Sequence, residues 1–205
     1  MMSHPKVVAD QLYSGEGIAA DVARIAVANI LLALCAHIVI PLPWTPVPIT
    51  GQTFAVLLAG VLLGSRRGAI TLILYLLEGL AGLPVFQPLG LPGPARLLGP
   101  TAGYLISYPA AAFVTGWLVE RATGLGRFGG KNLRLAEFPL IGALISGEAI
   151  IFAGGCAWLA LGMGLGWSVA LHQGALPFLP GEIIKIGLIV IIIEGFHLSR
   201  RKSPR

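Results

Sequence analysis

Long apolar runs alternate with short connections along the whole chain, and their lengths carry the first structural prediction. A helix needs about 20 residues to cross the roughly 30 Å hydrocarbon core of a bilayer, and fewer where the bilayer thins. The pattern predicts an all-α integral membrane protein with six transmembrane helices, at 18–40, 50–63, 68–83, 101–119, 138–161 and 181–196. The second and third runs are short, and GSRRG between them predicts a tight helix-to-helix turn at Gly64 and Gly68.

Basic residues favour one side of this six-helix arrangement. Of the 14 Lys and Arg residues, only Arg96 falls on the opposite side, while Lys185 falls at or within the sixth helix. Because basic residues are enriched on the cytoplasmic side, both termini are predicted to be cytoplasmic. The other basic residues are Lys6, Arg24, Arg66, Arg67, Arg121, Arg127, Lys131, Arg134, Arg200, Arg201, Lys202 and Arg205.

Composition agrees with a membrane protein and excludes several other classes. Apolar residues make up 56% of the chain and charged residues only 11%. The basic residues lie in short connections between apolar runs, so the positive charge indicates orientation rather than nucleic-acid binding. Residues 1–17 are polar and lack an early apolar run, so we expect a cytoplasmic tail rather than a signal peptide. The membrane domain is expected over 18–197, followed by a basic cytoplasmic tail over 198–205.

The three connections on the outward side differ from the basic ones. They read PLPWTPVPITGQT, PVFQPLGLPGPARLLGPTAGY and GMGLGWSVALHQGALPFLPG, and are rich in Pro, Gly and aromatic residues. Irregular backbone at membrane depth must be buried in protein or line a cavity, because hydrocarbon cannot satisfy its polar groups. These connections therefore predict an outward-facing pocket, although plain surface turns would show the same composition.

A carboxylate and an ammonium stand three residues apart in PFLPGEIIKIG, where the last apolar run begins. Glu182 and Lys185 share one face of a helix at this spacing, so they can serve one ligand. The alternative is that Glu182 only stabilises the helix N-terminus while Lys185 extends toward the interface. We favour a binding site, because a charged pair inside an apolar run is costly without a polar partner.

Other ionisable residues also fall within the apolar runs. Glu148 lies in the middle of the fifth run, where a buried partner and a functional role are equally compatible with the pattern. Glu78 and His37 lie near outward ends, close to the expected pocket, although a lone His is more often a satisfied core residue. Glu194 lies near the inward end of the last run, where interfacial pairing is expected. Cys35 and Cys156 fall inside apolar runs and are expected to pack as small hydrophobic residues.

Motifs for known enzyme chemistry are absent from the sequence. It contains no His-Glu-x-x-His, no Gly-x-Ser-x-Gly and no phosphate-binding GxxxxGK[ST] motif. Energy from ATP would therefore have to come from another protein, and no cofactor is expected in this chain. A small intramembrane transferase that uses Glu148 or Glu78 as a base stays an alternative. An ion channel is ranked last, because the sequence lacks the charged or carbonyl-lined filter that ion selectivity requires.

Several blocks of the sequence resemble a known family. IPLPWTPVPITGQTFAVLLAGVLLGSRRGAITLILYLLEGLAGLPVF, GPTAGYLISYP and PFLPGEIIKIG are similar to the signature blocks of BioY, the biotin-specific substrate-binding component of energy-coupling factor (ECF) transporters. The resemblance covers about 18–196. This sequence departs from the family pattern at three positions: Glu182, where the family usually has Asp; Ala102, where the family has Gly; and His37, where the family usually has Gln.

The resemblance implies a six-helix protein of a prokaryotic cell membrane that captures biotin from outside. It also implies partnership with a membrane scaffold subunit and two ATPases, which use ATP to drive release into the cytoplasm. In the family, small residues of the first helix contact the scaffold subunit, and Ala19 and Ala23 match best.

Biotin offers a ureido group, an apolar bicyclic ring and a carboxylate on an aliphatic arm. Glu182 suits a ureido N–H and Lys185 the ureido carbonyl, while Gln52 can serve either end of the ligand. The ring would lie against apolar side chains. The reverse orientation, with Lys185 on the carboxylate, stays open. Candidate wall residues are Trp44 and Tyr104, and Arg96 is the candidate partner of the carboxylate.

Overall fold

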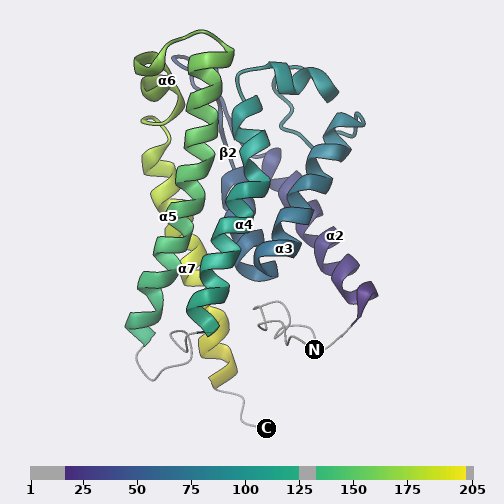
Figure 1. The fold of residues 1–205 in the computed structure, drawn as a ribbon, viewed down its shortest axis with the longest axis vertical. Helices are drawn as coiled ribbons and strands as arrows, with labels where there is room; N and C mark the ends of the chain where they lie inside the picture. Colours follow the sequence, from purple (N-terminus) through teal and green to yellow (C-terminus); the bar gives the residue numbers. More distant parts are fainter. Residues whose placement is uncertain (1–16, 125–132, 202–205) are drawn as a thin grey trace.

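In the part of the chain that the structure describes, five long helices form the body of the protein (Figure 1). The computed structural model describes residues 17–124 and 133–201, with side chains described over 17–122 and 138–195. The N-terminal tail predicted at 1–17 thus lies outside the described residues except for Gly17, as do Lys6, Arg127, Lys131, Lys202 and Arg205. The long helices are α2 (Ile18–Ala36), α3 (Gln52–Leu80), α4 (Ala102–Gly124), α5 (Leu133–Ala157) and α7 (Leu179–Arg201).

Helix α3 is broken at Gly64 into two arms that lie side by side. Gly64 has φ 81° and ψ −179°, which lies outside the helical region and suits glycine. Gln52 and Tyr75 would stand about 35 Å apart in a continuous helix, yet their side chains meet at 2.8 Å. The turn predicted in GSRRG is therefore confirmed. Glu120 of α4 stabilises it by accepting hydrogen bonds from the backbone N–H of Ser65 at 2.7 Å and its hydroxyl at 2.8 Å.

Glycines allow α4 to pack closely against the two arms of α3. A Cβ at Gly116 would lie 2.4 Å from Ser65 N, and one at Gly60 would lie 2.7 Å from Ala112 O. Small residues of this kind let helix backbones approach within a membrane, where packing rather than water drives association.

The helices are long and apolar enough for a multi-pass membrane protein. By length and composition, Ile18–Ala36, Gln52–Leu80, Ala102–Ala122 and Phe138–Gly162 qualify as spans within the described part of the chain. A bent pair, Trp167–Gly174 with Leu179–Gly195, adds a fifth span if its two helices, inclined at 50°, are taken together. Only 17% of the most apolar 18-residue stretch of α2 is buried, so most of this helix presents an apolar surface.

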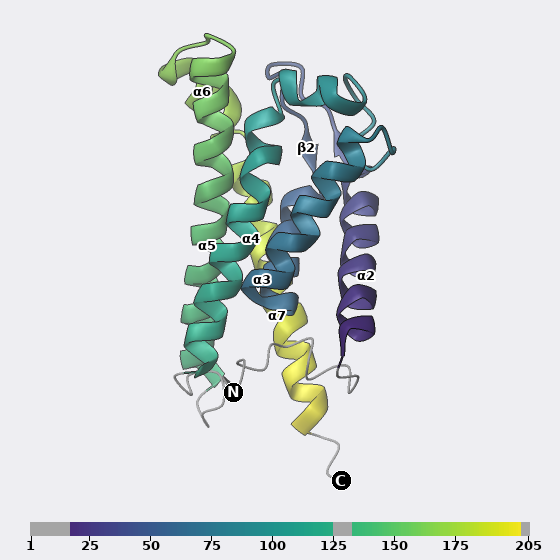
Figure 2. The same ribbon diagram turned by 45° about the vertical axis from the view of Figure 1, so that its right-hand side comes forward.

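Short elements gather at one end of the bundle (Figures 1 and 2). The strands β1 (Val39–Ile40) and β2 (Ile49–Thr50) pair antiparallel, with Val39 opposite Thr50. The 3₁₀ helix η1 (Gly93–Leu98), the π-helical turn η2 (Trp158–Gly162) and helix α6 (Trp167–Gly174) complete this end. The chain is thus mostly helical, as predicted, and the two short strands are an addition that the prediction did not include. The third outward connection contains a helix, since WSVALHQ between two glycines has adequate helix propensity.

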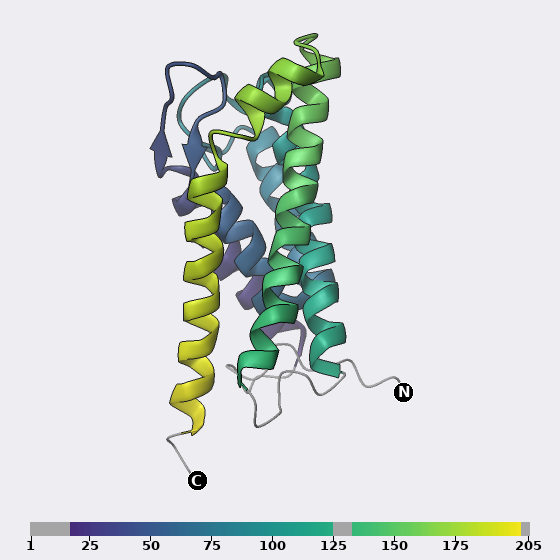
Figure 3. The same ribbon diagram turned by 90° about the vertical axis from the view of Figure 1, so that its left-hand side faces the viewer.

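The start of α2 and the end of α7 lie at the opposite end of the bundle from the short elements (Figures 1 and 3). Helix α7 begins at Leu179, two residues before its predicted start at 181, and continues to Arg201. The segment 198–201, predicted as part of the tail, is therefore helical. A pocket lies between the long helices, at the end of the bundle that carries the short elements.

Candidate functional site

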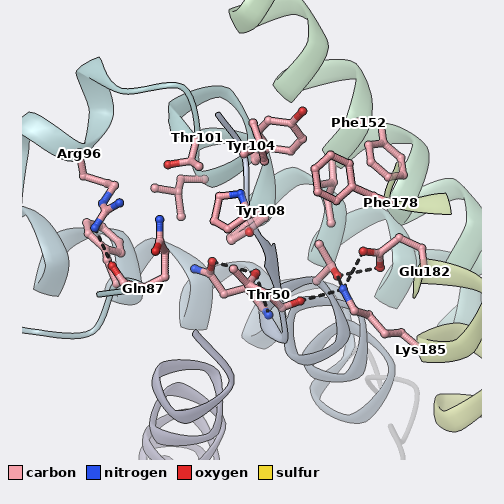
Figure 4. Close-up of a pocket in the computed structure, with 17 residues that line it drawn as sticks. Thr50, Gln87, Arg96, Thr101, Tyr104, Tyr108, Phe152, Phe178, Glu182 and Lys185 are labelled. Atoms are coloured by element: carbon pink, nitrogen blue, oxygen red, sulfur yellow. Dashed lines mark hydrogen bonds and ion pairs between the residues drawn. The ribbon is translucent and has the colours of Figure 1, made fainter. Parts of the chain in front are cut away.

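A pocket lies beneath the short elements and is lined by α3, α4, α5 and α7 together with the connections at 47–50 and 86–101 (Figure 4). The space not filled by atoms is about 550 Å³, including the part open to solvent. Nine of the 17 lining residues are aromatic or aliphatic, and the other eight carry polar or charged side chains. The aromatic members are Phe86, Tyr104, Tyr108, Phe152 and Phe178.

One end of the pocket holds a compact charged cluster. Lys185 Nζ lies 2.6 Å from Glu182 Oε1, and both side chains are largely buried, at 13% and 7% exposure. The ammonium also donates to the Thr50 carbonyl and to Thr53 Oγ1, each at 2.8 Å. Thr53 in turn donates its hydroxyl proton to Glu182 Oε2 at 2.7 Å. Every ammonium proton and both carboxylate oxygens therefore have a partner.

Helix α7 sets the geometry of this cluster. Glu182 lies in its first turn, where the helix dipole favours a carboxylate, and Lys185 follows three residues later on the same face. Thr50 and Thr53 come from β2 and the first turn of α3. The cluster thus joins the last helix to the start of α3, over about 130 residues of sequence.

Arg96 lies at the other end of the pocket, away from Glu182 and Lys185 (Figure 4). It belongs to η1, and its guanidinium donates to the carbonyl oxygens of Leu89 and, at 2.6 Å, Gln87. Its Nε has no hydrogen-bond partner, and no carboxylate pairs with it among the described residues. Burial lowers the pKa of the guanidinium from its ordinary value, and a buried cation without an anion favours a negatively charged ligand group.

Gln52 supplies an amide to the same pocket. It is buried at the first residue of α3, where Nε2 donates to Tyr75 Oη at 2.8 Å and Oε1 accepts from Thr50 Oγ1 at 3.2 Å. Each of its polar atoms keeps one further hydrogen-bonding position.

Five of the eight predicted substrate-binding residues line this pocket: Glu182, Lys185, Gln52, Tyr104 and Arg96. Tyr104 forms part of the wall, and its hydroxyl donates to the Gly174 carbonyl at 2.6 Å, which ties α4 to the end of α6.

The other three predicted residues, Trp44, Glu78 and His37, do not line it. Trp44 is 61% exposed, and the connection that carries it is joined to α6 by a hydrogen bond from Thr45 Oγ1 to Gln173 O at 2.7 Å. His37 caps the end of α2, with Nδ1 2.8 Å from Ala33 O. Glu78 Oε2 lies 2.8 Å from the side-chain nitrogen of Asn29, with that amide oriented to satisfy both groups.

Several polar lining residues were not singled out from the sequence: Thr50, Thr53, Gln87, Thr101 and Tyr108. Thr50 and Thr53 flank Gln52 in PITGQT, and Gln87 is a lone amide in a proline-rich apolar connection. The signal in the sequence that could have identified them is a polar residue within an apolar segment. Glu148, for which two roles were open, is buried, does not line the pocket, and has no hydrogen-bond partner for either oxygen in the described structure.

Comparison with known proteins gives consistent matches. A model of the BioY family matches residues 5–202. The chain is 41% identical over 158 residues to the biotin transporter BioY of Rhizobium etli, covering 77% of this chain and 82% of that protein. It is 35% identical over 189 residues to the biotin transporter BioY of Rhodobacter capsulatus, covering 82% and 94%.

A solved structure extends this match to the fold. The crystal structure of the S-component for biotin from an ECF-type ABC transporter aligns with a TM-score of 0.75 at 26% identity, over 92% of this chain and 96% of that one. Similarity in sequence and in fold thus extends along nearly the whole chain, and the chain belongs to the BioY family.

Proposed function

We propose that this protein binds biotin and serves as the substrate-binding subunit of an ECF-type ABC transporter for biotin uptake. The observation that carries the proposal is a pocket with a carboxylate–ammonium cluster at one end and, at the other, a buried guanidinium that pairs with no carboxylate among the described residues. Biotin has a hydrogen-bonding ureido group at one end and a carboxylate at the other. The named relatives and the solved S-component support the same ligand.

The arrangement favours one orientation of the ligand. The ureido group lies at Glu182 and Lys185: Glu182 keeps lone pairs for an N–H, and the Lys185 ammonium donates to the ligand carbonyl by giving up one of its three protein acceptors. The ligand carboxylate lies at Arg96, whose charge is neutralised by no anion in the described part of the chain. The apolar ring packs between aromatic side chains such as Tyr104 and Phe178.

The membrane arrangement follows from the fold and the charge pattern. Each arm of α3 crosses the bilayer, and α6 with α7 forms the last crossing, which gives six in total. Both termini lie in the cytoplasm, and the pocket opens to the outside of a prokaryotic plasma membrane. Arg67, which pairs with Asp21 at 2.9 Å, lies at the cytoplasmic end in this arrangement.

Partner subunits supply the energy for uptake. A membrane scaffold subunit contacts α2, where Ala19 and Ala23 are exposed on an apolar surface, and two ATPase subunits hydrolyse ATP. This chain needs no cofactor of its own. An intramembrane transferase is disfavoured, because the relatives are named transporters.

Binding of labelled biotin to the purified protein tests the proposal. We expect tight binding by the parent and strong loss in Lys185→Ala and Glu182→Ala, with Ile183→Ala as a control because Ile183 is 70% exposed on the same helix turn. Absence of binding by the parent would contradict the function. Unchanged affinity in both site variants would contradict the site.

A further inference from the structure

Tyr75 lies behind the pocket rather than in its wall, in the second arm of α3. Its side chain is fully buried, with 0% exposure. The hydroxyl has two partners on opposite sides: it accepts from Gln52 Nε2 at 2.8 Å and donates to the Val85 carbonyl at 2.9 Å. Tyr75 therefore connects a pocket residue to the connection that follows α3.

These two hydrogen bonds fix the orientation of the Gln52 amide. A carbonyl oxygen can only accept, so the single hydroxyl proton of Tyr75 goes to Val85. The Tyr75 oxygen must then accept from Gln52, which directs Nε2 toward Tyr75. Gln52 Oε1 consequently takes the other side, where it accepts from Thr50 Oγ1 at 3.2 Å and keeps a second lone pair.

The same residue also supports the aromatic wall. The Tyr75 ring meets the Phe86 ring edge to face, with centroids 5.3 Å apart and an interplanar angle of 77°. Phe86, a lining residue, packs closely over Gly79, where a Cβ would lie 2.1 Å from its Cζ. Replacing Tyr75 by Phe removes the hydroxyl and leaves this ring contact in place.

We propose that Tyr75 is a positioning residue for ligand recognition, which holds the Gln52 amide so that Oε1 accepts a hydrogen bond from a ureido N–H of the ligand. The inference rests on the proposed function and deepens it. Without the Tyr75 hydroxyl, the amide is able to turn and present Nε2, a donor, to a ligand donor. The hydroxyl thus decides whether Gln52 presents its oxygen or its NH₂ group to the ligand, two orientations with nearly the same shape.

A double-mutant cycle on biotin affinity separates positioning from plain packing. The variants are Tyr75→Phe, Gln52→Leu and the double substitution, with binding and thermal stability measured on detergent-purified protein from biotin-depleted cells. We expect Tyr75→Phe to raise the Kd on the order of tenfold, the size of one lost hydrogen bond. In the Gln52→Leu background the same change should alter the Kd less than about twofold, because the group it positions is gone.

Thr71→Val provides a matched control. Thr71 is also fully buried in the same arm of α3, and its hydroxyl donates only to the Arg67 carbonyl at 2.9 Å. We expect it to change stability but leave the biotin Kd unchanged. Equal loss from Tyr75→Phe in both backgrounds, or no loss in either, would overturn the positioning role while leaving biotin binding by the parent intact.

A crystal structure of the parent with biotin gives an independent test should Tyr75→Phe fail to fold. We expect a ureido nitrogen within hydrogen-bond distance of Gln52 Oε1, with Nε2 still on Tyr75. Biotin bound in the pocket without contact to Gln52 would overturn the inference alone. Parent protein that binds no biotin at all would instead contradict the proposed function.

Discussion

Thr53 lies between Lys185 and Glu182, accepting a hydrogen bond from the ammonium at 2.8 Å and donating one to the carboxylate at 2.7 Å. The two charged groups also meet directly at 2.6 Å. A single hydroxyl therefore completes a closed triangle of contacts at the pocket end. This triangle holds both charges in place where little water reaches them.

Thr53→Val should weaken biotin binding by about tenfold, because both charged groups lose a hydrogen bond and their positions become less defined. Thr53→Ser retains the hydroxyl and should restore most of the affinity. Calorimetric titration of biotin into the two purified variants measures the difference. A Val variant that binds as tightly as the Ser variant would contradict the role given to this hydroxyl.

Removing one charge of the pair should destabilise the protein more than removing both. Lys185→Met leaves the Glu182 carboxylate buried without its cation, which typically costs about 3–5 kcal/mol. Adding Glu182→Gln removes that uncompensated charge, so the double variant should recover part of the lost free energy of unfolding. Thermal denaturation without ligand measures this, and additive losses in the double variant would argue against a coupled pair.

Arg96 should discriminate between charged and uncharged forms of the ligand arm. Arg96→Gln should weaken binding of biotin by about tenfold or more, since a charge-assisted hydrogen bond contributes about 1.5–3 kcal/mol. Binding of biotin methyl ester, which lacks the negative charge, should change much less. The ratio of the two affinities in parent and variant is the measurement, and an equal loss for both ligands would favour the reverse orientation with Lys185 on the carboxylate.

Gly64 should tolerate no side chain without loss of stability. Its φ of 81° with ψ of −179° is a region that only glycine occupies readily, so Gly64→Ala should cost about 1–3 kcal/mol. Gly142→Ala is the control, because a Cβ there meets nothing within 4 Å and Ala favours a helix interior by up to about 1 kcal/mol. The midpoint of thermal unfolding should fall in the first variant and hold or rise in the second.

The helical framework could be predicted from the sequence because each apolar run is long and self-contained. The break at Gly64 was predictable as well, since GSRRG combines glycines with charge between two apolar runs. Helix α6 and the strand pair β1–β2 were not, because short elements depend on contacts with distant residues more than on their own pattern.

Within the site, Glu182 and Lys185 could be paired from their spacing on one helix face. The absence of Trp44 from the pocket wall could not, because it depends on how its connection packs against distant elements such as α6, which Thr45 contacts over 128 residues. The part played by Tyr75 was equally hidden, since its neighbour Gln52 lies 23 residues away and meets it only because α3 folds back.

The sequence alone determined the membrane class, the helical runs and the charged pair, because these follow from hydrophobicity and from spacing within one helix. The tertiary structure alone decided which groups share the pocket: Arg96 opposite the pair, Thr53 within it and Tyr75 behind it. Each of these relations joins separate elements, and the packing of helices, rather than any local pattern, sets the distance between them.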